Sequence, residues 1–186
     1  MLQATEYSKA PVIASHSGVW ELSKHRRNLS DEQLKAVGAA NGVVQIVGLD
    51  GFVKHYPEKG PEVAALRDVI IAAAGDAEWD GAKHAMVPEY VAGMEVINAK
   101  YPAATMDDFI DHIEYTVNLI GIDHVGIVSD FDGSGGLEGW NSAAETMNVT
   151  AALIDRGYSE EDIAKIWSEN TLALWRRVDA VAATLQ

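Results

Sequence analysis

Three short apolar runs predict buried β-strands. They are APVIAS (10–15), VVQIVG (43–48) and HVGIVSD (124–130), and their apolar residues follow one another without polar alternation. Such continuous runs are typical of parallel strands that helices cover on both faces of a sheet. The first run gives way to SHSG, so the first strand is expected to end at His16.

Segments with the periodicity of helices separate the three runs. Ser30, followed by two acidic residues, is expected to cap the first helix, and Gly42 is expected to end it. Ser159 is expected to cap the last helix, which follows a break at Gly157. The expected helices cover residues 29–42, 62–75, 88–102, 106–121, 148–157 and 159–185.

The alternation of strands and helices predicts parallel α/β units. The chain shows no internal repeat, low-complexity stretch or charged linker, so residues 1–186 are expected to form a single structural unit. Three strands make a small sheet, and this predicts that the chain is part of a larger α/β domain.

The composition narrows the class of protein. Lys and Arg number 14 against 28 Asp and Glu, a formal net charge of −14, and such a surface repels nucleic acid. No apolar run reaches the ~20 residues of a membrane span and no signal-peptide pattern opens the chain, so a cytoplasmic protein is expected. The chain has no cysteine, and a metal ion would therefore need histidine and carboxylate ligands.

Polar side chains follow each predicted strand. His16 ends the first strand, with Arg27 in the loop beyond it; Asp50 follows the second strand, with His55 further along, and Asp130 ends the third. In barrels and doubly wound sheets, functional residues gather at the carboxyl ends of the parallel strands. These side chains are therefore the candidates for a site.

Each candidate has a plain structural alternative. His16 could be a zinc ligand or a hydrogen-bonded loop histidine. Arg27 could clamp a carboxylate through its planar fork, or lie in solvent and pair with Asp31 or Glu32. Asp130 could hold an amine or position a metal-bound water, or it could cap the turn that follows. The spacing of these residues matches no compact metal motif.

The other histidines and the tryptophans are expected to be structural or without a role. His112 lies in an amphipathic helix and His124 directly precedes a strand, so both are expected to be structural. His25 and His84 fall in predicted loops and are given no role. Three tryptophans are expected to anchor the packing rather than to line a ligand cage: Trp140, Trp167 and Trp175.

Four blocks, taken together and in this order, are more specific than any single residue. APVIASHS, HRRNLSDEQLKAV, DHIEYTVNLIGIDHVGIVSDFDG and RGYSEEDIAKIWSEN closely resemble the membrane dipeptidase (renal dipeptidase) family of zinc peptidases. PEYVAGMEVINAKYP and GLEGWN are similar to its bacterial branch. The resemblance implies a metal-dependent hydrolase with a TIM (β/α)8 barrel that cleaves dipeptides with a hydroxide held by two zinc ions.

The resemblance also implies roles for three residues. His16 of SHS matches a zinc ligand, and Arg27 of RRN matches the arginine that binds the free carboxylate of the dipeptide. Asp130, the first Asp of DFDG, matches the catalytic acid that engages the substrate's amino group and helps proton transfer.

The chain departs from the family pattern in what it lacks. The His-x-Asp strand, the bridging glutamate, the oxyanion histidine and a DLSH-like stretch are not found in it, and it reads VSDFDG and WSEN where many members read GSDFDG and WGGN. The resemblance thus covers the C-terminal half, about the last three strands of the barrel. We expect the isolated chain to be inactive until a missing N-terminal half is supplied.

Two alternatives differ in class from a split dipeptidase. A non-catalytic remnant would serve as an interaction or homo-oligomer-forming module, and it would bind no stoichiometric zinc. Another barrel hydrolase of the amidohydrolase type would need a lysine or a histidine pair at the strand ends, and the sequence offers neither.

Overall fold

The computed structural model describes residues 1–185. The chain forms two compact units, Met1–His55 with Ala104–Gln186, and Tyr56–Ala103. The second unit is an insertion of helices between the second strand and the helix that leads to the third. The assignment of residues 1–186 to a single part-barrel domain stays a prediction.

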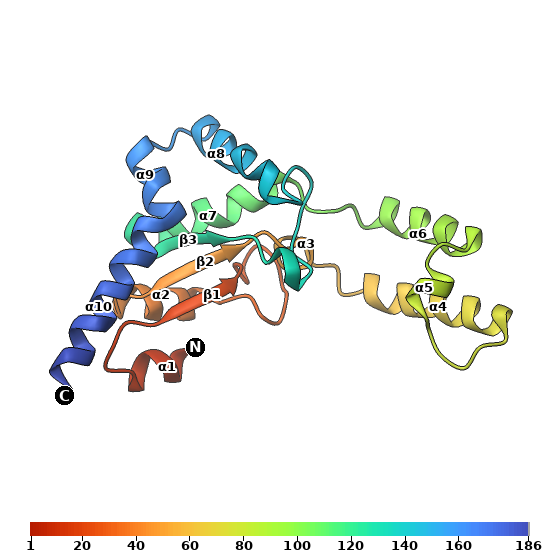
Figure 1. Ribbon diagram of the computed structural model, residues 1–186, viewed down its shortest axis with the longest axis horizontal. Helices are drawn as coiled ribbons and strands as arrows, with labels where there is room; N and C mark the ends of the chain where they lie inside the picture. Colours follow the sequence, from red (N-terminus) through yellow and green to blue (C-terminus); the bar gives the residue numbers. More distant parts are fainter. Residues whose placement is uncertain (186) are drawn as a thin grey trace. The chain divides into compact units, whose positions relative to one another are not determined.

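The first unit is built on a parallel three-stranded sheet in the order β1-β2-β3, as the apolar runs predict (Figure 1). The strands are β1 (Ile13–Ser17), β2 (Val43–Val47) and β3 (Val125–Val128). The β1–β2 register shifts between Ala14 and Ser17, whereas β2 and β3 pair without interruption. The pairing of β2 with β3 is thus the more regular of the two.

Different helices cover the two faces of the sheet. On one face, α2 (Asp31–Ala39) and α7 (Met106–Ile120) pack their apolar sides against the strands, and Phe109 of α7 is fully buried. On the other face, Gln45 of β2 donates a hydrogen bond to Thr171 of the C-terminal helix. Coverage on both faces explains why the strand sequences are apolar throughout.

The predicted helices of this unit form close to their expected bounds. Ser30 caps α2 in a capping box with Gln33, and Ser159 caps α9 in the same way, as predicted. The first helix already ends at Ala39, before the predicted stop at Gly42. The C-terminal helices are α8 (Thr146–Asp155), α9 (Glu160–Ala164), a π-helical turn (Lys165–Glu169) and α10 (Asn170–Thr184).

Gly42 has a packing role rather than a helix-ending one. A Cβ built on it would lie 2.4 Å from the carbonyl oxygen of Val12, so only glycine lets the chain enter β2 this close to β1. The sequence analysis did not predict two short helices of this unit, α1 (Leu2–Tyr7) and α3 (Asp50–Val53).

The second unit is a helical hairpin. It contains α4 (Lys59–Ala74), α5 (Gly81–His84) and α6 (Pro88–Lys100), and α4 packs along α6. The hydroxyl of Tyr101 donates a hydrogen bond to Glu62 at 2.7 Å, which joins the end of α6 to the start of α4.

A buried histidine closes the other end of the hairpin. His84 is 2% exposed, and its Nδ1 accepts a hydrogen bond from the Asp80 amide at 3.0 Å. With Nδ1 as acceptor, Nε2 carries the proton and donates it to Asp76 at 2.7 Å. Both ring nitrogens are therefore satisfied, and His84 is structural.

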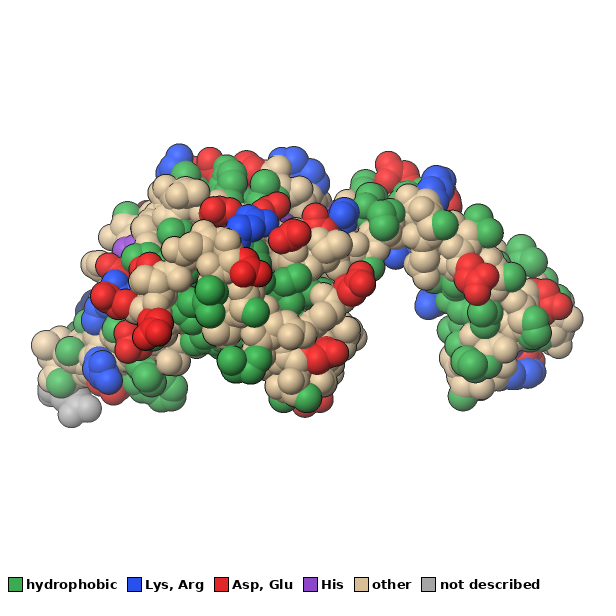
Figure 2. All heavy atoms as spheres, turned by 90° about the horizontal axis from the view of Figure 1, so that it is seen from above, with side chains coloured by type: hydrophobic (Ala, Val, Ile, Leu, Met, Phe, Trp, Pro, Cys, Tyr) green, Lys and Arg blue, Asp and Glu red, His purple; other side chains and the backbone are tan. Residues whose placement is uncertain are grey.

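The helical unit exposes apolar side chains that its own core does not need. Apolar atoms reach its surface in Figure 2, and Val69, Met86 and Val96 are 65%, 81% and 71% exposed. No helix within residues 1–185 is long and apolar enough to cross a membrane, as the sequence predicts.

Candidate active site at the carboxyl ends of the strands

The predicted site residues lie along one edge of the sheet. His16 is part of β1, Asp50 is the first residue of α3 and follows β2 closely, and Asp130 comes two residues after β3. Because the three strands are parallel neighbours, their carboxyl ends face the same side. The order of the strands thus brings together residues that are far apart in the sequence.

The structure places two of the predicted residues in direct contact. Arg27 donates a hydrogen bond from Nη2 to Nε2 of His16. Since this nitrogen acts as the acceptor, Nδ1 carries the proton and donates it to the Ser15 hydroxyl at 2.9 Å. Both ring nitrogens of His16 are thus engaged within this chain.

Arg27 is held at its backbone as well as at its side chain. Its carbonyl oxygen accepts a hydrogen bond from the Ser17 hydroxyl at 2.8 Å, and its amide donates to Nδ1 of His25. The guanidinium carbon lies 5.1 Å from the centre of the Phe52 ring, in a cation–π contact. Three separate segments therefore fix the position of an otherwise exposed cation.

Arg27 does not form the ion pairs that were its structural alternative. Asp31 accepts a hydrogen bond from Tyr115 at 2.8 Å and lies 4.0 Å from Lys35, and no ion pair joins Arg27 to Asp31 or Glu32. Within residues 1–185, Arg27 has no carboxylate partner at all. Its charge is left available to a ligand.

Two more histidines belong to the same region: His55, which the sequence analysis placed among the candidates, and His25, to which it gave no role. The centroid of the His25 ring lies 4.1 Å from that of Phe52. The ring of His55 lies edge-on to the ring of His25, with 5.1 Å between their centroids. Burial lowers the pKa of His25, and the positive charges of His55, Arg26 and Arg27 lower it further. The run KHRRN could have suggested His25, since it stands two residues before Arg27.

Asp130 occupies a strained turn after β3. Its φ of 55° is in the left-handed region, and its carbonyl oxygen accepts hydrogen bonds from the amides of Gly133 and Gly135. A Cβ on Gly135 would lie 2.0 Å from the carbonyl oxygen of Ser129, so the tight turn requires glycine there.

The Asp130 carboxylate is free. It makes no hydrogen bond that caps the following 3₁₀ turn (Phe131–Gly133), and it forms no ion pair within the described part of the chain. The backbone of Asp130 thus shapes the loop, while its side chain remains available as an acceptor.

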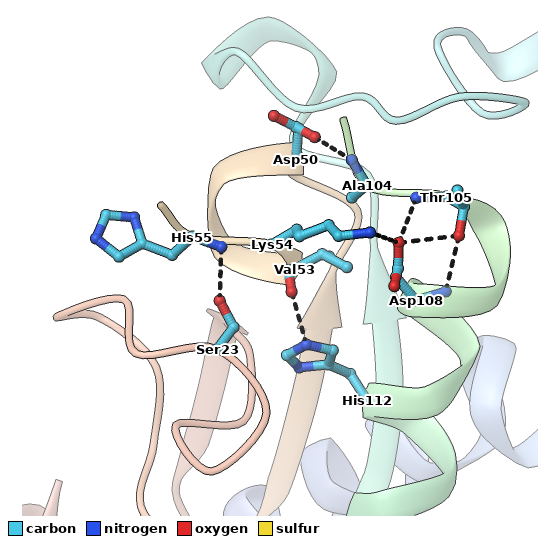
Figure 3. A network of polar contacts seen from close by, with 9 residues as sticks. All are labelled: Ser23, Asp50, Val53, Lys54, His55, Ala104, Thr105, Asp108 and His112. Carbon is cyan, nitrogen blue, oxygen red and sulfur yellow. Dashed lines mark hydrogen bonds and ion pairs between the residues drawn. The ribbon is translucent and has the colours of Figure 1, made fainter. Parts of the chain in front are cut away.

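Asp50, in contrast, is used by the fold (Figure 3). Its carboxylate accepts a hydrogen bond from the Ala104 amide, and this ties the start of α3 to the segment before α7. Nearby, Lys54 forms an ion pair at 2.9 Å with Asp108, which also accepts from Thr105 at the start of α7. The bond to the Ala104 amide makes Asp50 a structural residue.

The histidines predicted to be structural are confirmed as such. Nδ1 of the buried His112 accepts a hydrogen bond from the Val19 amide, and its Nε2 donates to the carbonyl oxygen of Val53 (Figure 3). Burial lowers the pKa of His112 and keeps it neutral. His124 donates from Nδ1 to the carbonyl oxygen of Gly42.

Two of the three tryptophans anchor the packing. Trp140 is 2% exposed, and Trp167 packs against the same core and donates a hydrogen bond to Thr150. The prediction for Trp175 is wrong, because this ring is 65% exposed on α10. It lies outside the buried part of α10, which is formed by Asn170 and Leu174.

The residues present do not by themselves fit a metal ion. Among residues 1–185, no group of three or more His, Asp or Glu side chains is placed to hold one. His16, the predicted ligand, gives its two ring nitrogens to Arg27 and Ser15. A catalytic zinc normally takes three protein ligands, so a complete site would need residues from outside this chain.

Comparison with known proteins places the chain in a family. Residues 1–186 match the family model for Membrane dipeptidase (Peptidase family M19). The chain therefore belongs to the membrane dipeptidase family, as the sequence blocks indicate. It is 33% identical over 184 residues to dipeptidase ataJ of Aspergillus terreus, an alignment that covers 98% of this chain and 34% of that protein.

Two further relatives extend the comparison. Dipeptidase tcpJ of Claviceps purpurea is 29% identical over 185 residues, 99% of this chain and 33% of the relative. The crystal structure of the probable dipeptidase PvdM from Pseudomonas aeruginosa is 36% identical with a TM-score of 0.73, and the match covers 96% of this chain and 48% of PvdM. The chain thus spans about a third of the curated relatives and about half of PvdM.

A more distant structure supports the fold alone. A metallo peptidase from Rhodobacter sphaeroides, solved with a phosphinate mimic of the dipeptide L-Ala-D-Ala, matches with a TM-score of 0.64 at 22% identity, covering 94% of this chain and 38% of that one. Structures of this family are TIM barrels, so the predicted fold class, the C-terminal part of a TIM barrel with three parallel strands, is confirmed.

Proposed function

We propose that this chain is the C-terminal part of a dipeptidase and that it hydrolyses dipeptides when the rest of the barrel is supplied. The observation that carries the proposal is the contact between His16 and Arg27 at the carboxyl edge of the sheet. Asp130 follows β3 at the same edge. Membership of a family of dipeptidases supports the reaction class.

Arg27 is the proposed ligand of the substrate's free carboxylate. Its guanidinium has no carboxylate partner within residues 1–185 and can offer two parallel N–H donors, which match the geometry of a carboxylate. Because Ser17, His25 and Phe52 already hold it in place, little conformational freedom is lost when substrate binds. This orientation would also present the peptide bond in one direction.

Asp130 is the proposed partner of the substrate's amino group. Its carboxylate is unpaired, and the glycine turn fixes its backbone rigidly beside β3. In this position it would bind the ammonium of a dipeptide and hold or pass on a proton when the leaving amine departs. Arg27 and Asp130 would thus bind the two charged ends of a zwitterionic dipeptide.

Residues 1–185 do not supply enough ligands to bind the proposed metal alone. Zinc is proposed as the metal of the complete site, two ions as the family resemblance implies, and His16 is proposed as one ligand. The remaining ligands would come from the rest of the barrel, because residues 1–185 hold no cluster that could bind an ion. When bound, such a metal would supply an activated water and polarise the carbonyl.

A reconstitution experiment tests the proposal. The chain is mixed with the segment of PvdM that it does not match, zinc is added, and hydrolysis of dipeptides with an L- or D-residue at the C-terminus is measured. We expect activity only in the mixture. Arg27→Gln should raise KM by roughly 10- to 100-fold, as expected for the loss of a bidentate ion pair, and Asp130→Asn should lower kcat.

The matched control is Arg176→Gln, which removes one exposed arginine of α10 far from the proposed residues in the sequence. It should leave both kinetic constants unchanged. A folded mixture that shows no hydrolysis at any zinc concentration would refute the proposal.

One observation favours a second candidate function, an interaction module without catalysis. The helical unit exposes Val69, Met86 and Val96, and within residues 1–185 no strand pairs with the outer edge of β1. Unpaired strand edges and exposed apolar patches favour association. Sedimentation of the purified chain together with zinc analysis separates the two: a stable oligomer that never gains zinc or activity supports the module.

A further inference from the structure

Four side chains at the carboxyl edge of the sheet concentrate N–H donors in a chain with a net charge of −14. This group, named here the strand-end cluster, consists of His25, Arg26, Arg27 and His55. The two arginines are exposed and the two histidines are half-buried. The local charge is thus opposite to that of the molecule as a whole.

No acidic side chain neutralises this cluster. Within the described residues, none of its four members forms an ion pair with Asp or Glu. Burial lowers the pKa of His25, and His55, Arg26 and Arg27 lower it further. Positive groups gathered without a counter-charge are a common mark of an anion-binding surface.

The cluster has more donors than a single carboxylate needs. Arg27 alone can satisfy both oxygens of a carboxylate through its planar fork. In addition, Nδ1 of His25 accepts a hydrogen bond from the Arg27 amide, so the proton of this ring lies on Nε2. Within residues 1–185, no group accepts a hydrogen bond from this Nε2. The ring of His55 likewise has no hydrogen-bond partner in the described chain, and it projects away from the sheet beside the loop of Ser23 (Figure 3).

The fold holds the two segments that carry these histidines. The ring of His25 is stacked on the buried Phe52, and the backbone amide of His55 donates to the Ser23 hydroxyl at 3.0 Å. Asn28 joins the same two segments, because its side-chain amide donates to the carbonyl oxygens of Ser23 and Phe52. The two histidine rings therefore meet beside the loop that carries Arg27.

We propose that the strand-end cluster selects a dipeptide with an acidic C-terminal residue, in which Arg27 binds the terminal carboxylate and His25 and His55 bind the side-chain carboxylate. The inference rests on the proposed function, and it adds a substrate class to it. A neutral amide isostere carries no negative charge and offers one acceptor oxygen in place of two, so it would bind the two histidine donors more weakly.

Binding to the chain as it exists tests the inference without any hydrolysis. Gly-Glu and Gly-Gln share a terminal carboxylate and differ only in the charge of the side chain. NMR titration of each dipeptide into the ¹⁵N-labelled chain should show Gly-Glu bound about fivefold more tightly, as expected for an exposed charged contact. The resonances of residues 23–28 and 52–55 should shift.

Variants separate the inference from the proposed function. His55→Gln leaves the contact between His25 and Arg27 in place, so it should narrow the difference between the two affinities by weakening Gly-Glu more than Gly-Gln, and the control Arg176→Gln should change neither affinity. Arg27→Gln should weaken both dipeptides equally. A preference for Gly-Glu that survives Arg27→Gln with unchanged affinities supports the histidine site but refutes the proposed role of Arg27.

Two results would overturn the inference. Equal affinity for Gly-Glu and Gly-Gln refutes an acidic side-chain site and leaves the proposed dipeptidase function intact. Absence of binding by either dipeptide also refutes the inference, and hydrolysis in the reconstituted mixture then judges the proposed function separately.

Discussion

The carboxyl edge of the sheet and the helical unit Tyr56–Ala103 use their polar groups in different ways. At the sheet edge, hydrogen bonds join segments far apart in the chain, such as the Val19 amide with His112 and Asn28 with Phe52. In the helical unit, the buried polar contact of His84 reaches only eight residues back, to Asp76. The first region is held by bonds between distant segments, whereas the polar bonds of the second stay within residues 56–103.

This difference shows where precise chemistry can be placed. Arg27 and Asp130 are held by backbone bonds, yet neither charged group forms an ion pair within residues 1–185. The helical unit, in contrast, exposes large apolar side chains such as Met86 and Val96. The proposed ligand contacts lie in the first region, and the proposed protein contacts lie in the second.

The largest expected effect comes from the core beneath the sheet edge. Phe109 is fully buried and its ring lies 5.5 Å from that of Trp140, so Phe109→Ala should lower the free energy of unfolding by about 3–5 kcal/mol. Urea unfolding followed by circular dichroism measures this change. Hydrogen exchange should show the loss in β1–β3 and little change in α4–α6.

The conservative variant Phe109→Leu keeps most of the volume and should cost much less. If exchange in α4–α6 rises as much as in the strands, the two units unfold as one, and the comparison between them is wrong.

Acid should separate the two regions next. The pKa of His112 lies below its ordinary value of 6.5 because the side chain is buried, so the unfolded chain binds a proton before the folded one does. Stability from His112 is complete above about 6.5 and is lost as pH falls from there to the lowered pKa. In the helical unit, hydrogen bonds from Lys83 and His84 lower the pKa of Asp76, whose contribution is lost only below about 3.8.

Between pH 7 and pH 5, therefore, the strand unit should lose stability while the helical unit keeps its own. Trp79 stacks on His84, and its indole NMR resonance reports on the helical unit during the titration. His112→Leu should flatten the pH dependence of the strand unit. A Trp79 signal that changes together with the strands over this range would contradict the prediction.

Much of the fold could be predicted because it depends on local signals. The apolar runs gave the three strands, and a serine followed by acidic residues gave the start of α2 at Ser30. The short helix α3 escaped prediction because its four residues have too little periodicity of their own. It is stabilised by a distant bond, from the Ala104 amide to Asp50.

The site could be predicted only as far as strand ends are recognisable. The positions of His16 and Arg27 follow from one strand and its loop, but Phe52 and His55 enter the region through α3. Their approach to His25 is set by tertiary packing, which no local pattern contains. For the same reason, the sequence could not show that Asp50 is taken up by the fold while Asp130 stays free.

A smaller effect is expected at the start of α2, which packs under the strand-end region. The Ser30 hydroxyl oxygen accepts a hydrogen bond from the Gln33 amide, and the Ser30 amide donates one to the side-chain oxygen of Gln33, so Ser30→Ala removes one bond of a capping box. The expected loss is about 1 kcal/mol in the free energy of unfolding. Ser30→Thr is the matched control, since it keeps the oxygen, and an equal loss in both variants would show that the hydroxyl does not cap.

The smallest effect on stability belongs to the exposed surface of the helical unit, and it is the sharpest test of the contrast. Val96 is 71% exposed on α6, so Val96→Lys should change the free energy of unfolding of the monomer by no more than about 0.5 kcal/mol. If this surface contacts protein, the same change should weaken self-association in sedimentation equilibrium, because a charge would have to be buried. Glu95→Lys, on the neighbouring exposed position, is the control for added positive charge. If the Val96→Lys variant self-associates as strongly as the unchanged chain, the apolar surface of the helical unit does not mediate self-association.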